Sequence, residues 1–157
     1  MDGWEAWQRR TRDGAIESEQ RVSLERPVVE HSPAGAERLG RAYWREVQRS
    51  TGSLVRARER DGAVELRLLG RAPVLLRFGA PSLEAGDGRV ACSYPIAGGL
   101  LTRRAGGELA FEQTSVGLRS TIRGFFPRIA FYDRLQGRMH VAVSRRYFRA
   151  LMAEASE

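Results

Sequence analysis

Hydrophobic and polar residues alternate in the stretch of chain that begins at Ile16. Ile16 and Val22 fall on one side of an extended backbone, and Glu17 and Glu19 fall on the other. A period of two residues is typical of a strand with one face in the core and one face in water. We therefore predict a first strand over residues 16–30.

A helix is predicted directly after this strand. Ser32 precedes Pro33, where the serine hydroxyl can accept from the free amides of a first helical turn and the proline has no amide to satisfy. Gly52 is a stop signal, so the predicted helix covers residues 33–49. Its apolar positions recur every three or four residues and are Ala36, Leu39, Tyr43 and Val47.

The middle of the chain contains six strand-like stretches separated by turn signals. Asp61-Gly62 has the composition of a two-residue hairpin, and Gly106-Gly107 that of a tight reversal. Each stretch alternates as the first strand does, so the sheet has one wet face and one face that needs a cover. The six predicted strands are residues 54–60, 63–69, 73–79, 89–97, 108–113 and 118–125.

The two ends of the chain complete the predicted α+β fold. Pro127 suits a first helical turn, and apolar residues then recur near helical spacing, so a long C-terminal helix over residues 127–153 is expected to cover the sheet. Near the N-terminus, Asp2 followed by Glu5 has capping-box spacing and favours a short helix. The expected organisation is an arm or short helix over residues 1–15 and one domain over residues 16–155, with about seven antiparallel strands.

Composition narrows the chemistry. All 26 basic residues are arginine, so lysine Schiff bases and phosphate-loop lysines are excluded and no cofactor is expected. One cysteine and two histidines leave no disulfide framework or cysteine-rich zinc site. The apolar runs are too short for a signal peptide or a membrane span, which leads us to expect a cytoplasmic protein.

The net charge of +7 raises the question of nucleic-acid binding. The arginines are spread along the chain, usually beside acidic residues, and this pattern argues against a phosphate-binding surface. A coding bias that replaces lysine with arginine is a simpler explanation of the composition than nucleic-acid binding, and no nucleic-acid partner is expected. An arginine-rich surface that binds an acidic partner stays open as an alternative function, as does a homodimer.

The order of a strand, a helix, six strands and a long C-terminal helix resembles the START-like, or SRPBCC, helix-grip superfamily. The resemblance is carried by the strand before Ser32-Pro33, by the hairpins at Asp61-Gly62 and Gly106-Gly107, and by the helix after Pro127. It implies a curved antiparallel sheet around the last helix, with an internal cavity for an apolar or aromatic small molecule. Members include lipid carriers, hormone receptors, polyketide cyclases and dehydratases. A single helix where two short ones are usual is a departure from the pattern.

The expected ligand-binding residues lie on the inner faces of the strands and on the last helix. His140 can project a titratable ring into the cavity, and Tyr94 shares a strand face that is apolar by composition. In a cyclase- or dehydratase-like enzyme these two would handle protons; otherwise His140 is a helix-flank residue and Tyr94 bonds to backbone. The set is Phe78, Tyr94, Phe111, Ile122, Tyr132, Met139 and His140.

Three other features have simpler interpretations. Cys92 would need a nearby histidine to act as a nucleophile, and a small buried hydrophobe is the favoured interpretation. Arg103 and Arg104 lie in a glycine-rich connection, where they would meet an acidic ligand at the cavity mouth or form a solvated turn. His31 and His140 are not spaced as ligands on one element, so no metal site is predicted.

Overall fold

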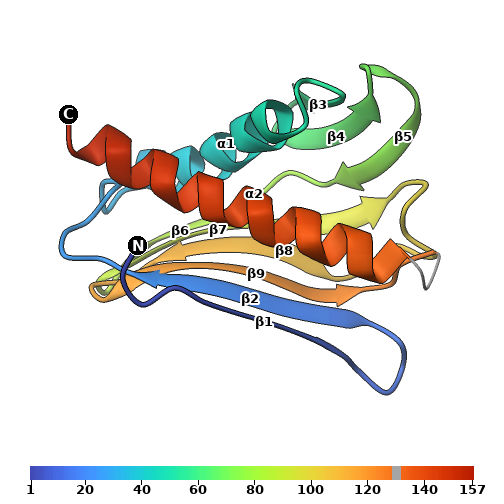
Figure 1. Cartoon of the computed structure of the whole chain (residues 1–157). Helices are drawn as coiled ribbons and strands as arrows, with labels where there is room; N and C mark the ends of the chain where they lie inside the picture. Colours follow the sequence, from blue (N-terminus) through green and yellow to red (C-terminus); the bar gives the residue numbers. More distant parts are fainter. Residues whose placement is uncertain (129–131) are drawn as a thin grey trace.

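The computed structural model describes residues 1–128 and 132–157, with the backbone only for residues 132–137. In this part of the chain, nine antiparallel strands and two helices form an α+β fold (Figure 1). The strands are β1 (Glu5–Arg10), β2 (Ile16–Ser23), β3 (Val55–Arg60), β4 (Ala63–Leu68), β5 (Arg71–Phe78), β6 (Ser82–Gly86), β7 (Arg89–Gly98), β8 (Glu108–Gln113) and β9 (Gly117–Phe125). The helices are α1 (Pro33–Ser50) and α2 (Tyr132–Ala155).

The sheet has the strand order β1-β2-β9-β8-β7-β5-β4-β3, and β6 also pairs with β7. β7 is shared along its length, because Ser93 pairs with β6 while Ile96 pairs with β5. In Figure 1, α2 runs diagonally across the sheet, with β1 and β2 on one side of it and β3 to β5 on the other. This arrangement is compatible with a helix-grip fold. Neither helix, within the described residues, is both long and apolar enough to span a bilayer.

As predicted, the alternation of apolar and polar residues determines which face of a core strand is buried. In β7, Val90, Cys92, Tyr94 and Ile96 are all at most 4% exposed. β4 buries Val64 and leaves Glu65 half-buried on the opposite face. The hairpin between β3 and β4 is also as predicted, because Asp61 and Gly62 have φ of 53° and 83°, which a type I′ turn requires.

Helix α1 begins where its capping residues predict. The Ser32 hydroxyl accepts a hydrogen bond from the Gly35 amide at 3.1 Å, and Pro33 occupies the first helical position. The helix packs closely on β7 at Gly40, where an added Cβ would lie 2.9 Å from Cys92 Sγ and 2.8 Å from Tyr94 Cε2. A side chain at this position would therefore separate α1 from the sheet.

The N-terminal segment differs from its prediction. The expected short helix is wrong, since residues 5–10 form strand β1, paired with β2 along its whole length. Every residue of β1 is exposed, so burial did not select the strand. Besides the backbone pairing, ion pairs join the two strands, Arg9 with Glu17 at 2.6 Å and Arg21 with Glu5. Such long-range pairing leaves no periodic signal in β1 itself.

Two element boundaries and one further strand also differ from the prediction. β2 ends at Ser23 rather than near residue 30, because the side chain of Gln113 takes over the hydrogen bonding of Val28 and Val29. Strand β6 was missed because all its residues are exposed, and with β1 it raises the count from about seven to nine in the described chain. Pro127 does not open α2. It forms a β-bridge with Thr102, and α2 begins at Tyr132.

Aromatic residues fill one end of the space between the sheet and the helices. Tyr147 of α2 donates a hydrogen bond to the Leu39 carbonyl of α1 at 2.8 Å, and its ring lies 5.3 Å from that of Phe111. We call this region the packed end. Full burial of such side chains stabilises the fold by about 1.5–3 kcal/mol each. It comprises Leu39, Cys92, Phe111, Tyr147 and Phe148, none more than 1% exposed.

Candidate functional site

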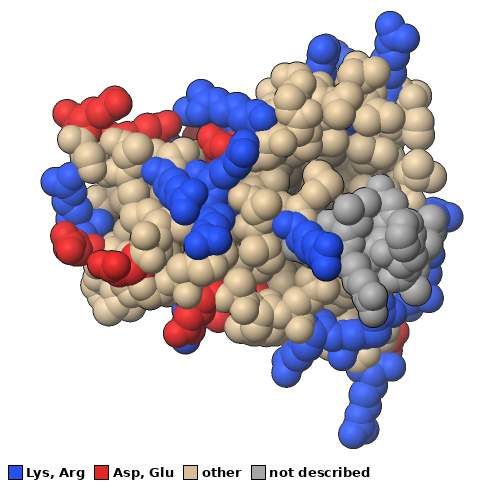
Figure 2. Space-filling view, viewed as in Figure 1, with Lys and Arg blue, Asp and Glu red and all other residues tan. Residues whose placement is uncertain are grey.

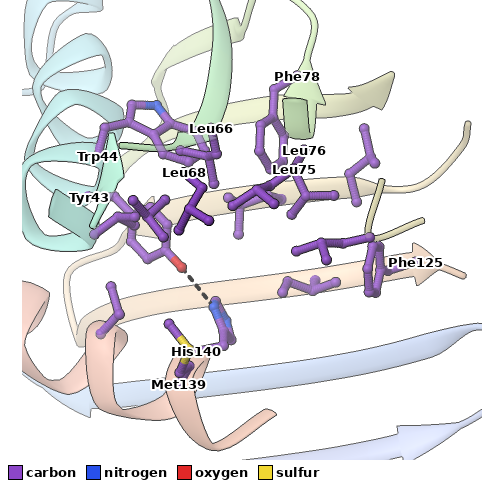
Figure 3. Close-up of a pocket in the computed structure, with 17 residues that line it drawn as sticks. Tyr43, Trp44, Leu66, Leu68, Leu75, Leu76, Phe78, Phe125, Met139 and His140 are labelled. Carbon is purple, nitrogen blue, oxygen red and sulfur yellow. Dashed lines mark hydrogen bonds between the residues drawn. The ribbon is translucent and has the colours of Figure 1, made fainter. Parts of the chain in front are cut away.

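The other end of the same space holds a cavity of about 300 Å³ (Figure 3). We call this region the hollow end. Its lining side chains come from both helices and from six strands, and none of those described carries a carboxylate or a guanidinium. They are Tyr43, Trp44 and Val47 of α1; Val55, Leu66, Leu68, Leu75, Leu76 and Phe78 of β3 to β5; Ile96, Leu109, Ile122 and Phe125 of β7 to β9; Leu101; and Met139, His140 and Val143 of α2.

The cavity is not fully enclosed, since some of its lining side chains reach the surface. Leu68 and Met139 line it and are 48% and 44% exposed, whereas the deeper Leu66 and Phe78 are buried. A volume of about 300 Å³ lies at the small end of the range for small-molecule sites, which is roughly 300–1,000 Å³. The hollow end therefore has the size and the entrance that a small apolar ligand requires.

One hydrogen bond provides the polarity of the hollow end. Tyr43 Oη and His140 Nδ1 lie 2.7 Å apart, which joins α1 to α2 directly (Figure 3). The second ring nitrogen of His140, Nε2, is buried without a hydrogen-bond partner among the described residues. Trp44 Nε1 is also buried and unpartnered, and it lies on the side of its ring away from His140 (Figure 3). A buried donor or acceptor without a partner destabilises a fold by about 1–3 kcal/mol.

Burial keeps both members of this pair neutral. The pKa of His140 is lowered to about 4, because burial penalises the imidazolium. The pKa of Tyr43 is raised for the same reason, since burial penalises the phenolate. At neutral pH the contact is therefore a hydrogen bond between two uncharged groups.

Four of the residues predicted from the sequence to bind a ligand lie together in the lining: Phe78, Ile122, Met139 and His140. Phe111 and Tyr94 belong elsewhere in the core. Phe111 is fully buried at the packed end, with its ring 4.6 Å from that of Tyr43. The side chain of Tyr132 lies outside the described residues.

Tyr94 does not line the cavity. It lies under Gly40 of α1, with its ring 5.2 Å from that of Trp44. Burial raises the pKa of its hydroxyl and raises that of the neighbouring Cys92 thiol to about 11. A thiol with a raised pKa is a poor nucleophile, so the structure favours a packing role for Cys92.

Most of the lining residues that sequence reasoning missed are on the strands, and three are on α1: Tyr43, Trp44 and Val47. Tyr43 was placed in the apolar stripe of the helix as a core residue, and its contact with a residue 97 positions away carries no local signal. Trp44 lies next to that stripe and is only 6% exposed. A tryptophan next to the predicted apolar stripe indicates that the buried face of α1 is wider than the stripe alone.

The remaining candidates lie away from the cavity. The Arg104 guanidinium stacks 3.7 Å above the Phe126 ring, and Arg103 donates its amide to the Phe126 carbonyl, so neither lines the site. His31 is exposed before α1. Among the described residues, no three His, Cys, Asp or Glu side chains are grouped so that they could hold a metal ion.

Comparisons with protein-family models, with curated proteins and with solved structures gave no match. The function of the cavity therefore has to be argued from its own residues. In the described part of the chain, those residues define an uncharged apolar interior, a half-exposed apolar edge and one buried imidazole nitrogen that lacks a partner.

Proposed function

We propose that this chain is a helix-grip protein that binds an uncharged apolar or aromatic small molecule at the hollow end. The observation that carries the proposal is the cavity of about 300 Å³, lined by apolar and neutral side chains from both helices and the sheet. Protein interiors are usually close-packed, and a hollow of this size loses the contacts that neighbouring atoms would make. An apolar ligand restores those contacts and leaves water.

The cavity supports modest affinity. A ligand of about a dozen non-hydrogen atoms, each contributing about −0.5 kcal/mol, would bind with a Kd of tens of micromolar. Its apolar body would contact leucines of β4 and β5, and its entry would be past Leu68 and Met139.

The enzyme alternative has less support. It required His140 and Tyr94 to act as a proton-handling pair, but Tyr94 lies outside the lining and His140 bonds to Tyr43. A general base works best when its pKa is near the working pH, and burial lowers the pKa of His140 to about 4. These observations favour a binding role for His140.

The arginine-rich surface also supports binding of an acidic partner poorly. Figure 2 shows arginines scattered over the face in view, with acidic residues and uncharged surface between them. On the sheet, Arg119 is paired with Glu112 at 2.9 Å and Arg89 with the same carboxylate at 2.6 Å. Cations that are already paired have less to gain from an acidic partner.

The binding proposal is tested with N-phenyl-1-naphthylamine, a neutral apolar dye whose fluorescence rises in apolar surroundings. We expect saturable binding to the wild-type protein and a loss of at least tenfold in affinity for Ile122→Trp, whose indole would occupy the cavity. Leu83→Trp is the matched control, because Leu83 is 39% exposed on β6 and does not line the cavity.

Two outcomes would overturn the binding proposal. One is the absence of saturable binding to the wild-type protein, and the other is equal affinity for the Ile122 and Leu83 variants. Should Ile122→Trp fail to fold, as judged by circular dichroism, Met139→Trp at the half-exposed entrance takes its place.

A further inference from the structure

The unpartnered nitrogen of His140 specifies which polar group a ligand carries, if the proposed binding function holds. The side chain lines the cavity and is 8% exposed. Its Nδ1 is paired with Tyr43 Oη at 2.7 Å, while its Nε2 is buried without a hydrogen-bond partner among the described residues. Nearly all buried polar groups in folded proteins are hydrogen-bonded, so an unsatisfied nitrogen on a side chain that lines a ligand-sized hollow indicates a missing partner.

The contact with Tyr43 decides which ring nitrogen carries the proton. If the Tyr43 hydroxyl donates to Nδ1, the proton of the neutral ring is on Nε2, and only that one donor is left over. If Nδ1–H donates to Tyr43 Oη instead, both the hydroxyl hydrogen and the Nε2 lone pair lack partners in the described part of the chain. The first arrangement leaves fewer buried groups unsatisfied and is therefore favoured.

We propose that the ligand of the hollow end carries an uncharged oxygen acceptor, such as a ketone or ester carbonyl, that accepts a hydrogen bond from Nε2–H of His140. This inference rests on the proposed function and adds a selection rule to it. A pure hydrocarbon would fill the cavity but leave the imidazole donor unpaired.

The acceptor is uncharged because the cavity offers nothing to balance a charge. No described lining side chain is an arginine or a carboxylate, and the nearby Arg104 stacks on Phe126 outside the lining. A carboxylate would lose its hydration without gaining a cation as a partner. Burial of an unpaired anion is strongly unfavourable. The site therefore selects a carbonyl over both a hydrocarbon and an acid of the same shape.

The first experiment compares three probes of one shape by displacement of N-phenyl-1-naphthylamine at pH 7.5. They are 2-acetonaphthone, 2-ethylnaphthalene and 2-naphthoate. We expect the ketone to bind about 5- to 10-fold more tightly than the hydrocarbon, the usual net effect of one buried hydrogen bond, and the carboxylate to bind most weakly. In His140→Phe the ketone should lose its advantage, so that the ketone and the hydrocarbon bind with equal affinity.

The outcomes separate this inference from the binding proposal. Equal binding of ketone and hydrocarbon to the wild-type protein, or a preference for the carboxylate, would overturn the inference while leaving apolar ligand binding intact. Failure of all three probes, together with failure of the dye, would overturn the binding proposal.

The second experiment needs no variant of His140 and so stands even if His140→Phe does not fold. The chain has two histidines, so His31→Gln leaves His140 as the single imidazole. The ¹⁵N chemical shifts of its ring at neutral pH identify the protonated nitrogen. A proton on Nε2, with a shift change there when 2-acetonaphthone is added, supports the inference. A proton on Nδ1, or no change at Nε2, contradicts it.

Discussion

The packed end and the hollow end lie along the same layer, between the same sheet and the same pair of helices, yet only one of them is filled. At the packed end, Phe111 and Tyr147 reach across from opposite sides, and Gly40 lets α1 lie close on β7. At the hollow end, the strands present mainly aliphatic side chains such as Leu66 and Leu76, and a cavity of about 300 Å³ remains beside them. How closely the facing side chains pack, and not the strand pattern, separates the core from the cavity.

Tyr43 marks the boundary between the two ends. Its ring contacts Phe111 and Tyr147 at the packed end, with centroids 4.6 and 5.5 Å away, while its hydroxyl reaches His140 at the hollow end. The residue is therefore both part of the core and the support of the His140 imidazole, which lines the cavity. A binding site placed beside a rigid core has its polar group held in position before the ligand arrives.

The largest expected difference between the two ends is in the effect of truncation. Phe111→Ala should lower the free energy of unfolding by about 3–5 kcal/mol, because the ring is fully buried among other rings. Leu75→Ala should lower it by roughly 1 kcal/mol, because Leu75 is half-buried and already borders empty space. Urea denaturation followed by circular dichroism measures both. Equal losses would show that the hollow end is packed as tightly as the rest of the core.

The sequence predicted this fold where the signal was local. Alternation assigned the buried face of β7, and Ser32-Pro33 placed the start of α1, because each depends on residues that are neighbours in the chain. β1 was missed because its partners are charges on β2, and all of its own residues are exposed.

The candidate site was predictable only in part, for a related reason. Phe78, Ile122, Met139 and His140 were found because each lies on an apolar face. The hydrogen bond between Tyr43 and His140 was not predicted, because it joins residues 97 positions apart. Whether side chains fill the space between sheet and helices depends on their volumes in two helices and six strands together. No single stretch of sequence predicts that total.

A smaller difference between the two ends concerns pH. Burial lowers the pKa of His140 to about 4, below the value of about 6.5 for an unfolded histidine. Between these values the unfolded chain binds a proton that the folded chain does not, so the stability from this group is complete above about pH 6.5 and is lost as the pH falls toward 4. From pH 7.5 to 5.0 the loss is about 2 kcal/mol.

Urea denaturation at the two pH values measures this effect as a difference between proteins, because carboxylates also titrate in this range. His140→Phe should lose about 2 kcal/mol less than the wild-type protein, since it has no buried imidazole to protonate. His31→Gln is the control and should behave as the wild-type protein does, because His31 is exposed. The same pH response in His140→Phe and the wild-type protein would show that the imidazole is not held in its neutral form.

The smallest expected effect is that of a larger side chain at the hollow end, and its sign is opposite to that of the same exchange at the packed end. Leu76→Phe at the hollow end should raise the free energy of unfolding by up to about 1 kcal/mol, since the added atoms enter empty space, and should weaken binding of N-phenyl-1-naphthylamine. Leu39→Phe, the same exchange at the packed end, should lower it by about 1–3 kcal/mol, because Leu39 is fully enclosed. Thermal unfolding of both variants measures these changes in stability. A loss of stability in Leu76→Phe would mean that the leucines of β5 have no free space before them.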